Sequence, residues 1–181
     1  MLILASASPR RKAILEQLGV EFRVEVPDVE ELESGDPREV VVENALRKAR
    51  ARARPGERVL GADTAVVLDG EPFGKPPDVA AAAELLRRLS GREHEVMSGI
   101  ALCEDGAERS DLEVTLVRFR TLTEADVDWY LAGGEWREHA GGYAIQKRGA
   151  ALVESIEGDY WNVVGLPVPA LLRLVPDLLR G

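Results

Sequence analysis

The sequence predicts an α/β protein whose sheet is mixed, and two observations lead to this class. Strand-like apolar runs alternate with helical segments along the 181 residues, which favours an α/β arrangement. Two turn signals, Asp69-Gly70 and Glu104-Asp105-Gly106, each lie between strand-like runs and indicate β-hairpins. Hairpins require antiparallel strand pairs, so we do not expect a purely parallel sheet.

Helices are expected where a capping residue precedes a helical segment. Ser8 and Asp36 are each followed by proline, which is typical of an N-cap and the first helical position. The elements expected in chain order are a strand over Met1–Ala5, a helix from Pro9 to Leu18, a strand over Phe22–Val26, an acidic loop over residues 27–37, a helix from Pro37, the hairpin at Asp69-Gly70, a helix after Asp78, the hairpin at residues 104–106, a helix from Thr123 through Leu131, short strands and turns over residues 141–167, and a helix from about Pro167 to Leu179.

The composition is that of an ordinary globular protein, with 45% hydrophobic and 30% charged residues. A net charge of −9 disfavours binding to duplex nucleic acid but is compatible with a small anion bound by a local cluster of cations. No apolar run is long enough to span a bilayer, and the N-terminus lacks the pattern of a secretory signal. Cys103 is the only cysteine, which fits a reducing compartment, so we expect a cytoplasmic protein.

Residues 4–11, LASASPRR, place two arginines at the expected start of a helix. Cations are unfavourable there because the helix dipole is already positive, so a negative ligand is expected at this point. The hydroxyls of Ser6 and Ser8 and the guanidinium groups of Arg10 and Arg11 would bind an anion such as phosphate. Taken alone, the pattern is better explained by a serine N-cap followed by solvated arginines.

Asp63 follows an apolar run within GADTAVV, and Lys75 is held between Gly74 and Pro76 in the next hairpin. A carboxylate at a strand end could hold Mg²⁺ or orient a water molecule, or it could bond its own backbone in a turn. Lys75 could be a fixed cation or a solvated turn residue. Together with Arg10 and Arg11, these residues supply what a phosphoanhydride needs: cations for phosphate and a carboxylate for metal and water.

Other candidates are weaker on their own. Carboxylates of the acidic loop (Glu30, Glu31 and Glu33) could complete a metal site or form a solvated face. Lys48 lies among basic residues of a helix, where a surface position is the default. Gln146 carries an amide suited to the edge of a nucleobase, or makes an ordinary hydrogen bond. We interpret both histidines as structural.

Six motifs occur in register over nearly the whole chain: LASASPRR, GADT, GKP, LSGREHEVMSG, AGGYAIQ and GDYWNVVGLP. Their order resembles that of the Maf family of nucleoside triphosphate pyrophosphatases. The resemblance implies one domain over residues 1–181 with a fold similar to inosine triphosphate pyrophosphatases. In that fold an elongated mixed sheet is flanked by helices, and two lobes leave a central cleft. The resemblance also implies cleavage between the α- and β-phosphates, a divalent cation (Mg²⁺ or Mn²⁺) and, as a further expectation, a homodimer.

The resemblance assigns roles to single residues. The proton acceptor for water falls on Asp63, and the other catalytic residues on Lys75, Arg11, Lys48 and Glu31, where Glu30 is the neighbouring alternative. The metal ligands are Asp63 and Glu31. The positions for base selection fall on Arg10, Thr64 and Gln146. Ser6 and Ser8 are expected to bind substrate as well, because their hydroxyls lie in the expected anion site at the start of the helix.

The combination of SPRR, GADT and IQ resembles the branch that hydrolyses dTTP and UTP. Where the family often has glycine after this glutamine, the chain has Lys147. Three alternatives stay open: a pyrophosphatase for another nucleotide such as 7-methyl-GTP, a nucleotide-binding regulator of septum formation, and, least favoured by the net charge, a nucleic-acid binder that uses the basic helix of residues 48–54.

Overall fold

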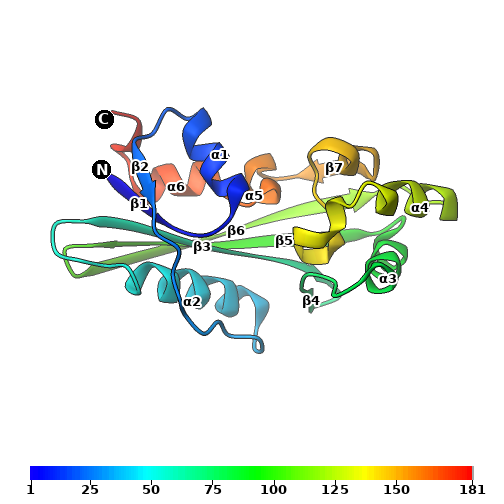
Figure 1. Cartoon of the computed structure of the whole chain (residues 1–181), viewed down its shortest axis with the longest axis horizontal. Helices are drawn as coiled ribbons and strands as arrows, with labels where there is room; N and C mark the ends of the chain where they lie inside the picture. Colours follow the sequence, from blue (N-terminus) through cyan, green and yellow to red (C-terminus); the bar gives the residue numbers. More distant parts are fainter. Residues whose placement is uncertain (181) are drawn as a thin grey trace. The chain divides into compact units, whose positions relative to one another are not determined.

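The structure is a computed structural model that describes residues 1–180, and its framework is a seven-stranded sheet with helices packed on it (Figure 1). The strand order is β2-β1-β3-β5-β6-β7, and β4 pairs with β3. Strand β1 is parallel to β2 and β3, whereas β3–β4 and β6–β7 are antiparallel. The expected mixed α/β class is therefore confirmed.

The helices and strands begin close to their sequence signals. Their bounds are β1 (Leu2–Ala5), α1 (Pro9–Gln17), β2 (Phe22–Val24), α2 (Pro37–Arg50), β3 (Arg58–Leu68), β4 (Glu71–Phe73), α3 (Val79–Leu89), β5 (Glu93–Glu104), β6 (Ala107–Phe119), α4 (Glu124–Ala132), η1 (Glu135–Glu138), η2 (Ala140–Gly142), η3 (Lys147–Ala151), β7 (Val153–Glu157), α5 (Tyr160–Val164), α6 (Val168–Leu174) and η4 (Leu178–Arg180), where η marks a 3₁₀ helix.

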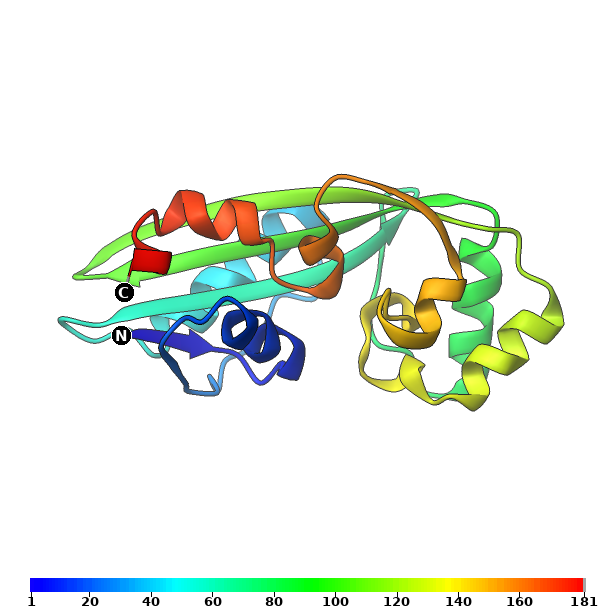
Figure 2. The same ribbon diagram turned by 90° about the horizontal axis from the view of Figure 1, so that it is seen from above.

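The chain forms two compact units. Unit 1 comprises residues 1–64, 98–113 and 165–181, and unit 2 comprises residues 65–97 and 114–164. In unit 1, α2 covers one face of the sheet, while α1 and α6 cover the other (Figures 1 and 2). A small apolar core lies between α2 and the sheet, formed by Ile3, Ala5, Ala45, Ala49, Val59, Ala101 and Cys103.

Unit 2 has its own apolar core, in which α3 and α4 pack against the ends of the long strands. Phe119 and Tyr130 are fully buried there, with Leu86 and Leu89 from α3. Within residues 1–180, no helix has the length and apolar character required to cross a membrane.

The local signals for caps and hairpins are confirmed. Asp78 accepts a hydrogen bond from the N–H of Ala81 at 2.8 Å, and Thr123 forms a capping box with Asp126. In both hairpin turns the two central residues have left-handed backbone conformations. Their φ values are 54° and 80° at Asp69-Gly70, and 49° and 80° at Asp105-Gly106. Positive φ at both central residues matches the twist of the flanking strands.

Two expectations near the C-terminus are wrong. Residues 141–167 form mainly short helices (η2, η3 and α5), with β7 as the one strand of this segment. The last helix ends at Leu174 and a separate turn, η4, begins at Leu178. Pro176 explains the break, because proline lacks an N–H and forces Val175 out of the helical region, to φ −130° and ψ 73°.

Candidate active site

Unit 1 contains a buried lysine between two carboxylates. Lys48 lies on α2 and is only 8% exposed. Its Nζ is 2.8 Å from Asp63 Oδ1 and 2.9 Å from Glu31 Oε2. A lysine is buried at this depth only when its charge is compensated, so the three residues form one electrostatic group. The surface position considered for Lys48 is wrong, and Glu31 rather than Glu30 directs its carboxylate to it.

The sequence predicted Asp63 at a strand end or in a turn, but it lies in the middle of β3. Two glycines of the sheet let α2 pack directly on it. A Cβ on Gly61 would overlap the carbonyl oxygen of Ala45, and one on Gly99 would overlap that of Val41. This close approach brings the side chains of α2 within hydrogen-bond distance of Asp63.

Arg11 is also buried in unit 1, at 8% exposure, and is held by three separate segments of the chain. Its guanidinium donates to the carbonyl of Gly165 (2.9 Å), to Ser6 Oγ (3.1 Å) and to Thr64 Oγ1 (3.1 Å). Burial lowers the pKa of Arg11 to about 10, an effect that the charge of Asp63 opposes, so the group is still protonated at neutral pH. The solvated-arginine interpretation is wrong for this residue.

The start of α1 supplies further polar groups. Ser8 is the N-cap, and its side chain accepts from the N–H of Arg11, while its own N–H donates to Ser6 Oγ at 3.2 Å. Arg10 is half-buried in the first turn. Unit 1 thus contains Ser6 just after β1, Ser8, Arg10 and Arg11 at the start of α1, and Thr64 in β3. Glu31, Lys48 and Asp63 belong to the same unit.

Lys75 and Gln146 belong to unit 2. Lys75 is 62% exposed and forms an ion pair with Glu138 at 3.2 Å. Gln146 is half-buried at the start of η3. Lys147, which follows it, has a φ of 55°. Glycine adopts this left-handed conformation without steric cost, so glycine is favoured at this position. The roles of Lys75 and Gln146 stay predictions.

The histidines make structural contacts. His94 is 2% exposed, and its Nε2 lies 2.7 Å from the hydroxyl of Tyr143. Burial lowers the pKa of His94 to about 4, so the imidazole is neutral in the folded protein at pH 7. His139 Nδ1 lies 2.6 Å from the carbonyl oxygen of Glu135.

Two buried polar residues near the site were missed by sequence reasoning. Asn44 is 2% exposed, and its Nδ2 lies 3.2 Å from Asp63 Oδ2. Ser98 is fully buried, with its Oγ 2.8 Å from Thr64 Oγ1. Asn44 precedes Lys48 by four residues, so the helical repeat could have indicated it; Ser98 has no comparable local signal.

Asp63 and Glu31 suit a magnesium ion. Each directs one oxygen to the ammonium group of Lys48, so the two carboxylates lie close to each other. Mg²⁺ is commonly bound by one or two carboxylates together with water and substrate phosphates. Within residues 1–180, no group of three or more His, Cys, Asp or Glu side chains is placed to hold a metal ion.

Comparison with known proteins identifies relatives that match nearly the whole chain. The dTTP/UTP pyrophosphatase of Symbiobacterium thermophilum is 50% identical over 178 residues, covering 96% of this chain and 92% of the relative. Proteins of the same name from Clostridioides difficile and Pyrococcus furiosus are 46% and 42% identical, covering 99% and 96% of this chain and 93% of each relative. Among solved structures, the Ham1 protein of Staphylococcus aureus matches with a TM-score of 0.47 and 20% identity, covering 65% of this chain and 71% of that one.

The family model described as "Maf-like protein" matches residues 1–178. The same residues carry the six motifs. They also include Lys48 on α2, Asp63 on β3 and Glu31 in the loop before α2, which form the charged group. The chain belongs to the Maf family.

Proposed function

We propose that this protein hydrolyses dTTP and UTP to the nucleoside monophosphate and pyrophosphate, the activity after which its relatives are named. The observation that best supports a hydrolase is the buried Lys48 between Asp63 and Glu31, at 2.8 and 2.9 Å. Even when buried charges pair, the cost of removing them from water can exceed the attraction between them, so a role in chemistry explains this arrangement better than a gain in stability.

In the proposed mechanism Asp63 is the general base. Its carboxylate accepts a proton from the water molecule that attacks the α-phosphorus. Lys48 and Asn44 both donate to this carboxylate, through Nζ to Oδ1 and Nδ2 to Oδ2. These two contacts fix the orientation of Asp63 before substrate binds, so no reorganisation is needed during the reaction.

The polyphosphate would bind at the start of α1. Backbone N–H groups at a helix N-terminus bind anions, and Arg10 adds a cation in the first turn. Arg11 uses three of its donors to fix its own position. Since a guanidinium group has about five N–H donors, the others can bind phosphate. Lys75 would contribute a further cation. These groups offset the repulsion between the triphosphate and a protein with a net charge of −9.

Asp63 and Glu31 would hold the divalent cation, Mg²⁺ or Mn²⁺. When bound, this cation neutralises phosphate charge and stabilises the pyrophosphate leaving group. Lys48 stands between these carboxylates and keeps them from repelling each other in the free enzyme.

Base selection is assigned to Arg10, Thr64 and Gln146. The hydroxyl of Thr64 contacts both Arg11 and Ser98, at 3.1 and 2.8 Å, so its orientation is fixed within unit 1. The amide of Gln146 can donate and accept at once, as recognition of a pyrimidine edge requires. The proposal includes one functional domain made of both units, and a cytoplasmic location, where nucleoside triphosphates are available.

The test is a pyrophosphate-release assay with a panel of nucleoside triphosphates, with and without Mg²⁺ or Mn²⁺. We expect metal-dependent turnover of dTTP and UTP, and much slower turnover of purine nucleotides. If 7-methyl-GTP is turned over faster than dTTP and UTP, the substrate assignment is wrong and 7-methyl-GTP takes their place. Folded protein that binds dTTP but turns over no nucleotide would overturn the enzymatic proposal in favour of a regulatory binding protein.

A further inference from the structure

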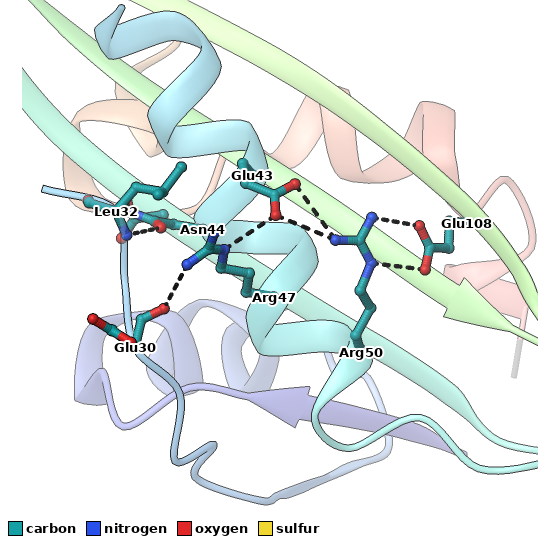
Figure 3. Close-up of polar contacts among 8 residues, drawn as sticks. Glu30, Leu32, Glu43, Asn44, Arg47, Arg50 and Glu108 are labelled. Carbon is teal, nitrogen blue, oxygen red and sulfur yellow. Dashed lines mark hydrogen bonds and ion pairs between the residues drawn. The ribbon is translucent and has the colours of Figure 1, made fainter. Parts of the chain in front are cut away.

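Two side chains of α2 hold the acidic loop on either side of Glu31 (Figure 3). Before it, Arg47 Nη1 donates to the carbonyl of Glu30 at 3.0 Å. After it, Asn44 makes two hydrogen bonds with the backbone of Leu32, accepting from its N–H at 2.7 Å and donating to its carbonyl at 3.1 Å. The backbone is therefore fixed immediately before and after the residue that contacts Lys48.

The positions of these side chains follow from the helical repeat. Asn44, Arg47 and Lys48 are spaced three and four residues apart, so they share one face of α2. Figure 3 shows Asn44 and Arg47 directed toward the loop. The same helix face thus supplies both the charge partner of Glu31 and the groups that hold the backbone around it.

Asn44 links the loop to the proposed base as well. Its Nδ2 donates both to the carbonyl of Leu32 and to Asp63 Oδ2, at 3.1 and 3.2 Å. Together with the bond from the N–H of Leu32 to Oδ1, every polar atom of this buried amide is used. One side chain therefore sets the distance between the loop and β3.

Arg47 is held in place by Glu43 on the surface of unit 1, and Arg50 also contacts this glutamate (Figure 3). Glu43 Oε1 accepts from Arg47 Nε at 3.1 Å and from Arg50 Nη1 at 3.3 Å. Arg50 in turn makes a bidentate pair with Glu108 on β6, with both distances 2.8 Å. Arg50 resembles Arg47 in residue type, in its position on α2 and in its contact with Glu43. Its other partner, Glu108, lies on β6 and not in the loop.

We propose that Asn44 and Arg47 are positioning residues that clamp the acidic loop and hold Glu31 at Lys48 and Asp63. The side chain of Glu31 is 46% exposed and lies in a loop outside the sheet, so without the clamp it would sample many positions. Holding it in place before substrate arrives lowers the entropic cost of assembling the site. The proposal rests on the proposed function, because Glu31 is assigned to catalysis there.

The first experiment is a double-mutant cycle on the full chain with dTTP and Mg²⁺. We expect Asn44→Ala to lower kcat about 30-fold and Arg47→Ala about 3-fold, with smaller changes in KM, because a misplaced group costs turnover. In a Glu31→Gln background, Arg47→Ala should cause no further loss of kcat. Asn44→Ala should still lower kcat there, but only by the part of its effect that acts through Asp63. The matched control, Arg50→Ala, should retain wild-type kinetics.

The second measurement is hydrogen exchange of the Leu32 amide in the free protein, without metal or nucleotide. We expect this amide to exchange at least about 10-fold faster in Asn44→Ala, and the loop segment around it to exchange faster in Arg47→Ala, with no change in Arg50→Ala. If Asn44→Ala does not fold, the kinetic cycle and the hydrogen-exchange measurement are made with Arg47→Ala and its control, Arg50→Ala.

The clamp is overturned if both variants leave loop exchange unchanged, or if Arg47→Ala and Glu31→Gln are fully additive. It is also overturned if Arg50→Ala behaves like Arg47→Ala. Failure of the proposed function is a separate result, because it requires wild-type protein that turns over no nucleotide. In that case loop exchange alone decides whether the two side chains hold the loop.

Discussion

The two units differ in whether they bury charged side chains. Unit 1 buries Arg11 and Lys48, each at 8% exposure, while unit 2, whose residues the structure describes throughout, buries no charged side chain. Lys48 in unit 1 and Lys75 in unit 2 both pair with carboxylates, at 2.8 and 3.2 Å. The exposed fraction of the two lysine side chains is 10% and 62%, so the pairs differ in surroundings far more than in distance.

Exposed and buried ion pairs contribute differently to the stability of the folded protein. An exposed ion pair contributes about 0–1 kcal/mol to the free energy of unfolding, because water competes for both ions. A buried pair depends on each partner, since removal of one leaves the other without compensation. Unit 1 therefore carries the charges whose removal is expected to change both stability and turnover.

The largest expected effect comes from Asp63→Asn. The variant keeps the shape of the side chain but cannot accept the proton of water, so we expect kcat for dTTP to fall by about 10³-fold. Folding should be retained, because Lys48 still pairs with Glu31. Asp177→Asn, which alters an exposed pair with Arg58 in the same unit, is the control. Wild-type turnover by Asp63→Asn in a pyrophosphate assay would exclude it as the base.

Lys48→Met should lower both turnover and stability. We expect kcat to fall by about 10²-fold, because Asp63 and Glu31 lose the group that orients them. The free energy of unfolding should fall by about 1–3 kcal/mol, less than for a fully enclosed pair because Glu31 is partly exposed. Urea denaturation without metal measures this loss. Stability equal to that of the wild type would show that burial of Lys48 has no energetic consequence.

His94 shows how unit 2 buries a titratable group in its neutral form. Its folded pKa of about 4 lies below the ordinary value of 6.5, so between these values the unfolded chain binds the additional proton. The stabilising contribution is present above pH 6.5 and is lost as the pH falls toward 4. We expect wild-type stability to decrease by about 2 kcal/mol more than that of His94→Gln between pH 7 and pH 5. Parallel pH profiles in denaturation experiments would contradict this.

Lys75→Met sharpens the comparison with Lys48→Met. Because the pair with Glu138 is exposed, we expect the free energy of unfolding to change by less than about 0.5 kcal/mol. Turnover of dTTP should nevertheless fall by about 10-fold if Lys75 binds phosphate. A loss of stability as large as that of Lys48→Met would remove the contrast between the two units.

The smallest expected effect is at Lys147. Its φ of 55° is unfavourable for a residue with a Cβ, and Lys147→Gly should raise the free energy of unfolding by about 0.5 kcal/mol. Pyrimidine preference should be unchanged if the ammonium group faces solvent. A changed ratio of dTTP to UTP turnover would instead place this cation near the base.

Sequence reasoning succeeded where a structural feature depends on a few neighbouring residues. The caps at Ser8, Asp78 and Thr123 and both hairpins use bonds within about four residues. The break at Pro176 was equally local, but its signal was overlooked. The family resemblance is confirmed by the match to residues 1–178.

The sequence by itself determined the class of fold, the starts of the helices and the set of residues that resembles a pyrophosphatase. Only the tertiary structure decided that Asp63 lies inside a strand, that Lys48 and Arg11 are buried, and that Asn44 joins the loop to β3. Those outcomes depend on the close packing of α2 over Gly61 and Gly99, residues 11 or more positions from the helix. Burial is a property of such distant contacts, and it decides whether a charge is a surface group or part of a site.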